Sequence, residues 1–205
     1  MTNRLHIALL LLAVGLSGTA RAQEAEHYFA FWGEGGAALR LSVPAPDKIP
    51  IGAGGGGGLG YELNYNRFIM QIGLHANTTW ERQADEEAYY HYISMQTPLL
   101  FGGEFNHLYF LAGGKFDLNV FTDNPQVDED TFLFSYDALA SAEIGLNWTL
   151  QQYRYTKPKI RLALYADYGV LCNRLQAGLK LTFLFGGKAH ENHVCRVCPD
   201  YKPFR

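Results

Sequence analysis

Apolar residues alternate with small or polar residues along most of this chain. Between residues 28 and 43, Phe29 and Phe31 share one face, whereas Glu34 and Arg40 share the other. Successive side chains of a β-strand point to opposite faces, so this period of two predicts a long strand with one apolar face. A helix would instead repeat its apolar residues three and four positions apart.

The same alternation recurs seven more times, and together the segments predict eight strands. These strands comprise residues 28–43, 58–65, 68–77, 92–104, 108–120, 134–148, 160–170 and 175–185. Most of them exceed the roughly 5–6 residues usual for soluble proteins and reach the roughly 9–11 that a tilted strand needs to cross a bilayer. The pattern therefore predicts an all-β fold, an eight-stranded antiparallel up-and-down transmembrane β-barrel.

The connections between the predicted strands alternate in length. If the N-terminus is periplasmic, the first, third and fifth connections are external and long: residues 44–50, 81–89 and 122–131. The second and fourth are short: residues 66–67 and 104–107. Outer-membrane barrels have long outer loops and short periplasmic turns, although residues 151–158 and 171–174 depart from this rule. A soluble lipocalin-like barrel, with the same apolar faces turned inward, is an alternative.

The first 22 residues have the features of a cleavable signal peptide. Arg4 precedes a short apolar stretch at 7–16, and Ala20-Arg21-Ala22 forms a small-residue cleavage site. The apolar stretch is too short to span a hydrocarbon core of about 30 Å. We expect a signal peptide at 1–22, an outer-membrane barrel at 23–186 and a periplasmic C-terminal tail at 187–205.

Charged residues fall on the polar faces of the predicted strands. The interior of an eight-stranded barrel is just wide enough for side chains to fill it, and buried charges are stable only when they are paired. We therefore expect a lumen charge network of Glu34, Arg40, Glu62, Lys115, Asp117, Glu143, Arg161, Asp167 and Lys180. A narrow ion path and an active site are the alternatives for the same residues.

Two further features suggest chemistry only weakly. The glycine run at 52–58 contains G-x-G-x-x-G, but a strand follows it where a dinucleotide site needs a helix. We expect a strand start at which glycines permit close approach of a bulky neighbour such as Trp32. His75 should face inward, where Ser94 or Ser141 could be neighbours, but no motif links them and we expect a hydrogen-bonded lining residue.

The C-terminal tail carries a candidate metal site. His190, His193, Cys195 and Cys198 form H-x2-H-x-C-x2-C, and imidazoles and thiolates are the ligands that zinc prefers. The periplasm oxidises thiols, so a Cys195–Cys198 disulfide competes with zinc. A redox role for the two cysteines is a third possibility.

Three short motifs carry a family resemblance: QTPLLFG at 96–102, YFLAGG at 109–114 and LKLTFLF at 179–185. They resemble the PorT-like, porin-family outer-membrane β-barrel proteins. The resemblance implies an envelope barrel in the outer membrane, without catalytic residues in common. The family pattern has a proline at the position of Pro98, where we expect a local bulge. The tail beyond the last strand departs from the family.

Composition narrows the possible functions. The 205 residues are 48% hydrophobic and 14% aromatic, which excludes a disordered chain, and the net charge of −3 excludes nucleic acid as a partner. We expect a non-catalytic outer-membrane protein with a structural role, a role in surface interaction through acidic outer loops, or an accessory role in an export or uptake assembly. Its partners would be outer-membrane lipid and other envelope proteins. The alternatives are a narrow porin for small solutes and, less favoured, a membrane-embedded barrel hydrolase.

Overall fold

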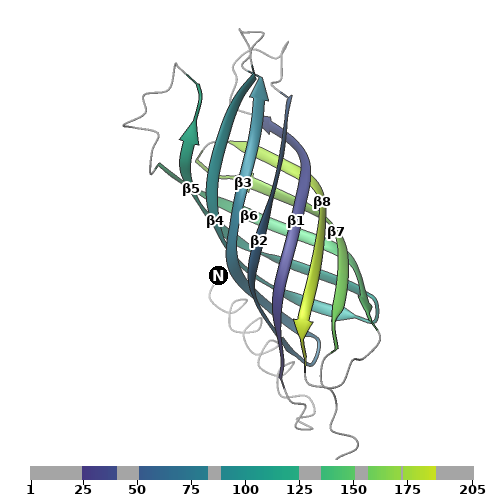
Figure 1. Cartoon of the computed structure of the whole chain (residues 1–205). Coiled ribbons are helices and arrows are strands. Elements are labelled where there is room, and N and C mark those ends of the chain that lie inside the picture. Colours follow the sequence, from purple (N-terminus) through teal and green to yellow (C-terminus); the bar gives the residue numbers. More distant parts are fainter. Residues whose placement is uncertain are drawn as a thin grey trace, which may run out of the picture.

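Eight antiparallel strands close into one barrel (Figure 1). The computed structural model describes residues 25–40, 51–82, 89–124, 135–150, 157–171 and 173–187. The strands are β1 (Glu26–Arg40), β2 (Ile51–Tyr65), β3 (Phe68–Arg82), β4 (Tyr89–Phe105), β5 (Leu108–Thr122), β6 (Tyr136–Thr149), β7 (Lys159–Gly169) and β8 (Arg174–Gly186). Each strand pairs with its sequence neighbours, and β1 pairs with β8 to close the sheet. The predicted eight-stranded, up-and-down topology is confirmed.

Tight turns lie at the lower end of the barrel, which is the end where β1 begins and β8 ends (Figure 1). Asn66 and Asn106 both have a φ of 58° in two-residue connections between β2 and β3 and between β4 and β5. Asparagine tolerates this left-handed conformation better than other residues with a side chain, which explains its use at both turns.

Several segments named above lie outside the described residues. They are the signal peptide, the tail from residue 188 onward, and most of the connections at 41–50, 83–88, 125–134 and 151–156. The predicted loop lengths can still be compared with the strand ends. β3 continues to Arg82, so Glu81, which was expected in an acidic outer loop, instead lies in a strand and is 7% exposed.

The two faces of the barrel wall differ in where they place charged and large apolar side chains. Large apolar side chains such as Phe29 and Leu164 are 68% and 62% exposed on the outside, whereas Glu62 and Arg161 are 0% and 1% exposed on the inside. A soluble barrel would place these faces the other way round, so that alternative is wrong. In water the outer face would form an apolar belt around the molecule. In lipid it is stable, because a closed barrel satisfies its backbone polar groups internally.

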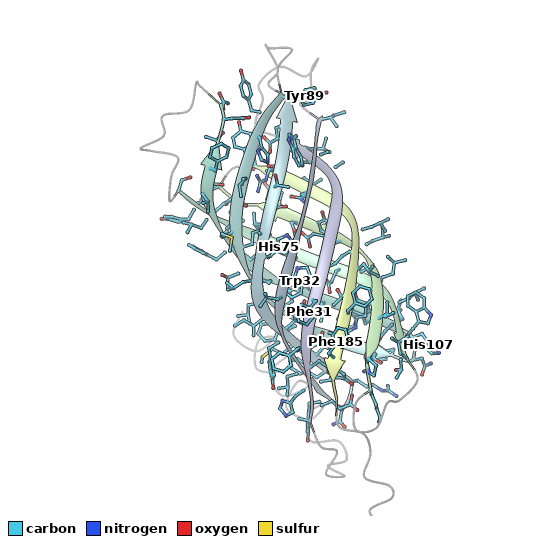
Figure 2. The ribbon with its side chains drawn as sticks, viewed as in Figure 1. Phe31, Trp32, His75, Tyr89, His107 and Phe185 are labelled. Atoms are coloured by element: carbon cyan, nitrogen blue, oxygen red, sulfur yellow. The ribbon has the colours of Figure 1, made fainter. Side chains whose placement is uncertain are left out.

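Aromatic residues gather at both ends of the apolar outer surface. Exposed rings near the lower end include Phe29, Tyr65, Phe68, Phe105, Trp148 and Phe185, and those near the upper end include Trp80, Tyr89, Phe121 and Tyr136. Figure 2 shows Tyr89 and Phe185 toward opposite ends. Leucines such as Leu74 and Leu179 occupy the band between them. Two aromatic girdles around an aliphatic band are typical of barrels that span an outer membrane.

No helix within the described parts of the chain is long and apolar enough to cross a membrane.

The glycine run belongs to a strand. β2 begins at Ile51, so all of 52–58 lies in the barrel wall. A Cβ atom added to Gly58 would lie 2.5 Å from the ring of Trp32, and one added to Gly73 on β3 would lie 2.6 Å from it. These two glycines therefore make room for the indole inside the lumen, as the sequence suggested.

The bulge expected at Pro98 is not present. Pro98 pairs with Lys115 of β5, and the register between β3 and β4 is the same on both sides of it. The ladder between β3 and β4 is only interrupted there, because proline has no N–H to donate. The register shift in β4 lies instead between Ile93 and Ser94.

Leu164→Arg should destabilise the barrel by about 2–4 kcal/mol, because an arginine near the bilayer midplane is costly. Leu164 is 62% exposed and pairs with Ile144 and Leu179 in the middle of the aliphatic band. Leu171→Arg, at a 63% exposed position in the β7–β8 turn, is the matched control and should cost about 0–1 kcal/mol. Urea unfolding of the barrel in lipid vesicles measures both. Equal effects of the two substitutions would contradict this placement of the membrane.

Candidate functional site in the barrel lumen

The alternation of the strands brings the predicted charged residues together inside the barrel. Eight of the nine have side chains that the structure describes, and all eight are buried: Glu34, Glu62, Lys115, Asp117, Glu143, Arg161, Asp167 and Lys180. The ninth, Arg40, ends β1, and its side chain lies outside the described part.

Two lysines hold the middle of the lumen. Lys115 Nζ on β5 lies 2.6 Å from Asp167 Oδ2 on β7 and 3.5 Å from Glu34 Oε1 on β1. Lys180 Nζ on β8 lies 2.6 Å from Glu143 Oε2 on β6 and 3.4 Å from Gln71 Oε1 on β3. Each ammonium therefore links strands on different sides of the barrel. Charge-assisted hydrogen bonds of this kind are roughly twice as strong as neutral ones.

An arginine and a lysine neutralise acids nearer the lower end. The Arg161 guanidinium donates to the Glu62 carboxylate, and its Nη2 is 3.7 Å from Glu104 Oε2. It also lies 4.5 Å from the centre of the Tyr109 ring, which is a favourable cation–π geometry. Lys159 Nζ is 3.4 Å from Glu104 Oε2. Because Arg161 is 1% exposed, its charge is balanced by these groups and not by bulk water.

Arg174 occupies the upper part of the lumen. Its Nη2 is 3.1 Å from Asp117 Oδ2, and its Nη1 is 3.8 Å from Glu81 Oε1. The sequence analysis omitted Arg174, Glu81, Glu104 and Lys159 from the network. Glu104 already lay within the predicted strand 92–104, whereas Glu81, Lys159 and Arg174 continue the inward-facing alternation just beyond the predicted ends of their strands.

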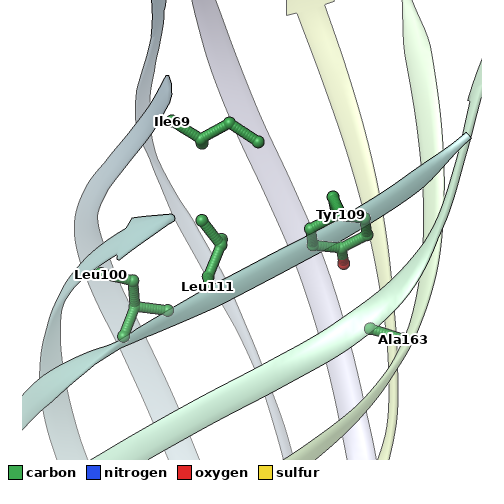
Figure 3. Packing of buried hydrophobic residues seen from close by; sticks show 5 residues of the cluster. All are labelled: Ile69, Leu100, Tyr109, Leu111 and Ala163. Carbon is green, nitrogen blue, oxygen red and sulfur yellow. The ribbon is translucent and has the colours of Figure 1, made fainter. Parts of the chain in front are cut away.

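Apolar side chains also fill part of the lumen. Ile69, Leu100, Tyr109, Leu111 and Ala163 form one buried cluster (Figure 3), and Tyr28, Ala30, Trp32 and Leu184 form another. Leu100 is an apolar residue on the inner face of β4, between Pro98 and Gly102, and it is 0% exposed. An interior of this width is filled by side chains, so the clusters and the ion pairs together form a packed plug.

His75 lies at mid-height beside Trp32 (Figure 2). Its Nδ1 accepts a 2.8 Å hydrogen bond from Trp32 Nε1, and its Nε2 is 3.6 Å from Glu34 Oε1. The residue opposite His75 on β4 is Gln96, whereas Ser94 pairs with Asn77. The imidazole thus contacts an indole and a carboxylate, and it does not form the serine–histidine pair that a hydrolase needs.

Metal binding was expected only in the tail. No group of three or more His, Cys, Asp or Glu side chains within the described residues could hold a metal ion. His190, His193, Cys195 and Cys198 lie outside those residues.

Comparisons with known proteins do not supply a family. No family model matches the chain, and no curated protein matches it significantly. Ail, the attachment invasion locus protein of Yersinia pestis, in complex with the heparin analogue sucrose octasulfate, is 14% identical with a TM-score of 0.34, and the match covers 82% of this chain and 100% of Ail. A second Ail structure is 15% identical with a TM-score of 0.31 and the same coverage.

The secretin InvG of the Salmonella SPI-1 type III secretion injectisome, in its open gate state, is 11% identical with a TM-score of 0.22, over 98% of this chain and 68% of that one. Likeness at this level is too weak to transfer any property. The fold assignment depends on the strand pairing of this chain itself, and the resemblance to PorT-like proteins stays a prediction.

Arg161→Met should destabilise the barrel by about 3–5 kcal/mol, because it leaves a buried carboxylate without its cation. That carboxylate is Glu62, which is 0% exposed. The double variant Glu62→Gln/Arg161→Met removes both charges and should recover much of the loss. Urea unfolding in vesicles, analysed as a double-mutant cycle, gives the coupling. Additive effects of the two substitutions would show that the pair contributes nothing.

Proposed function

We propose that the chain is an integral β-barrel of the bacterial outer membrane, without catalytic activity, that holds its external loops and its periplasmic tail on opposite sides of the membrane. The observation that carries this proposal is the placement of charged side chains on the inside of the barrel wall and of large apolar side chains on the outside. Charged residues such as Arg161 and Glu62 are paired inside, and large apolar side chains are exposed outside. A lumen filled by ion pairs suits a rigid membrane anchor for surface segments.

The external connections favour surface interaction over a purely structural role. Glu81 is in the lumen, but the upper connections still contain Asp85, Glu86, Glu87, Asp123, Asp128, Glu129 and Asp130. An acidic surface attracts cationic partners and repels polyanions. A basic protein segment of the envelope or of a neighbouring cell therefore fits this surface better than a sulfated ligand such as the one bound to Ail. An accessory role in an export or uptake assembly is compatible with the same surface.

Fractionation of cells that express the protein tests the proposal. We expect it in the outer-membrane fraction, with gel mobility that shifts on boiling as a folded barrel unfolds. Epitope tags inserted at 84–87 should be labelled on intact cells, whereas tags at Asn66-Arg67 should be labelled only after permeabilisation. Recovery of the protein from the soluble periplasm would overturn the proposal.

A narrow porin is the second candidate, and the lumen contacts oppose it. Lys115, Lys180 and Arg161 each bridge strands across the lumen, and the apolar cluster around Leu100 lies among them. Purified protein in planar bilayers should therefore show no large, stable conductance. A steady porin-sized current would favour the channel hypothesis over the anchor. A barrel hydrolase has no support from the contacts of His75.

The division into signal peptide, barrel and tail is part of the same proposal. Gly186 and Gly187 have φ values of 129° and 75°, conformations that favour glycine, and they end the barrel wall before the tail. A zinc site at His190, His193, Cys195 and Cys198 competes with a Cys195–Cys198 disulfide. One equivalent of zinc in the purified protein, lost in Cys195→Ser, would establish the metal site. Zinc-free protein with the two cysteines oxidised would establish the disulfide.

A further inference from the structure

The hydrogen bond between Trp32 and His75 depends on the protonation state of the imidazole. Trp32 Nε1 donates to His75 Nδ1 over 2.8 Å. An indole N–H is only a donor, and a neutral imidazole accepts through one ring nitrogen while the other carries the proton. Both nitrogens of a protonated imidazole are donors. The bond therefore requires a neutral His75 with its proton on Nε2, and protonation of Nδ1 must break it.

The charged groups near His75 contain one carboxylate more than they contain cations. Glu34 and Asp167 share the single ammonium of Lys115, whereas Lys180 has its own partner in Glu143. His75 Nε2 lies 3.6 Å from Glu34 Oε1. A protonated His75 would therefore balance the second carboxylate of this group.

Among the described side chains of β2 and β4, the strands paired with β3, no further charged group lies beside His75. Its register partner on β4 is Gln96, and a Cβ atom added to Gly56 of β2 would lie 2.5 Å from His75 Nε2. On β3 itself, the next inward-facing residues are Gly73 and Asn77. The charged groups around this imidazole are therefore the Glu34 carboxylate, which favours its protonation, and the ammonium groups of Lys115 and Lys180, which oppose it.

The indole of Trp32 is held independently of its hydrogen bond. It is 5% exposed, it packs against Gly58 and Gly73, and the Lys180 ammonium lies 5.1 Å from its ring centre. An ammonium has no lone pair to accept from the indole N–H. If His75 stops accepting, the indole N–H thus loses its hydrogen-bond partner in the buried lumen, and the environment of the indole changes.

We propose that His75 is an acid-operated switch in the lumen: protonation of Nδ1 breaks the hydrogen bond from Trp32, and the resulting imidazolium pairs with Glu34 in competition with Lys115. When His75 is neutral, Trp32 donates to His75, and Glu34 and Asp167 share the Lys115 ammonium. The protonated state exchanges the bond from Trp32 for an ion pair across β1 and β3. The switch acts on the packing at the centre of the plug and does not depend on what the external loops bind.

Trp32 itself reports on the switch. In a Trp80→Phe/Trp148→Phe background, Trp32 is the remaining tryptophan, and its emission is recorded in detergent micelles as the pH is lowered. We expect a single-proton transition in the emission. His75→Gln, whose amide oxygen can accept from the indole at every pH, should abolish the transition. Glu34→Gln should shift it to more acid pH, because the imidazolium loses its partner.

Retention of the same transition in His75→Gln would overturn the proposal, as would flat wild-type emission down to the pH at which the barrel loses its heat-modifiable mobility. If the variants fail to fold, nitrogen-15 spectra of the wild-type barrel decide. The indole N–H resonance of Trp32 and the ring nitrogens of His75 should then titrate together. Protonation of His75 that leaves the Trp32 resonance unmoved would also overturn the proposal.

Discussion

The pairing of β1 with β8 is the contact on which the rest of this structure depends. An open sheet leaves a row of unpaired N–H and C=O groups at each edge, and in hydrocarbon each such group costs several kcal/mol. Thirteen residue pairs, from Tyr28–Gly186 to Arg40–Arg174, join the first strand to the last. Closure removes both edges and makes the apolar outer face compatible with lipid. It also creates an interior that no lipid reaches, so every polar side chain pointing inward must find its partner there.

Two different kinds of packing fill that interior. Among the described residues, the half nearer the lower end combines apolar clusters with Arg161 and Lys159, whereas the upper half is lined mainly by polar and charged residues such as Asn77, Asp117 and Arg174. An apolar cluster needs no partner groups, and it lowers the dielectric constant around neighbouring ions. Ion pairs beside it are therefore strong when complete and costly when broken. The lower half is thus the part of the plug that should tolerate substitution least.

The sequence predicted the number of strands and their two faces because a period of two is imposed by backbone geometry alone. It predicted strand ends less well, since an end depends on whether the pairing partner continues. β2 runs back to Ile51 because β1 and β3 continue beside it, and glycines give no alternation to show this. Glu81 looked like a loop residue because it adjoins an acidic segment, yet β3 carries it inward opposite Arg174.

The lumen contacts were less accessible to prediction, because they join strands that are not neighbours. Alternation showed that Lys115 faces inward, but its partners lie on β7 and β1, at positions set by the stagger between strands. The bulge at Pro98 was expected for a sound reason, namely the missing N–H. The ladder between β3 and β4 is instead interrupted at Pro98, without an inserted residue. The missing N–H explains the interruption, and the unchanged register on either side explains why no bulge forms.

The glycines of β2 and β3 show how wall and lumen are coupled. A side chain at Gly58 or Gly73 would occupy the space that the Trp32 ring fills, so the missing side chains on two strands allow one large residue on a third. That ring in turn places its N–H against His75 and its face toward Lys180. The position of two ionisable groups thus follows from residues that carry no side chain at all. Polar side chains in place of these glycines would fill the same volume, but they would not leave room for an indole between an imidazole and an ammonium. Because the indole N–H donates to His75, the packing at the centre of the plug depends on the protonation state of a single imidazole.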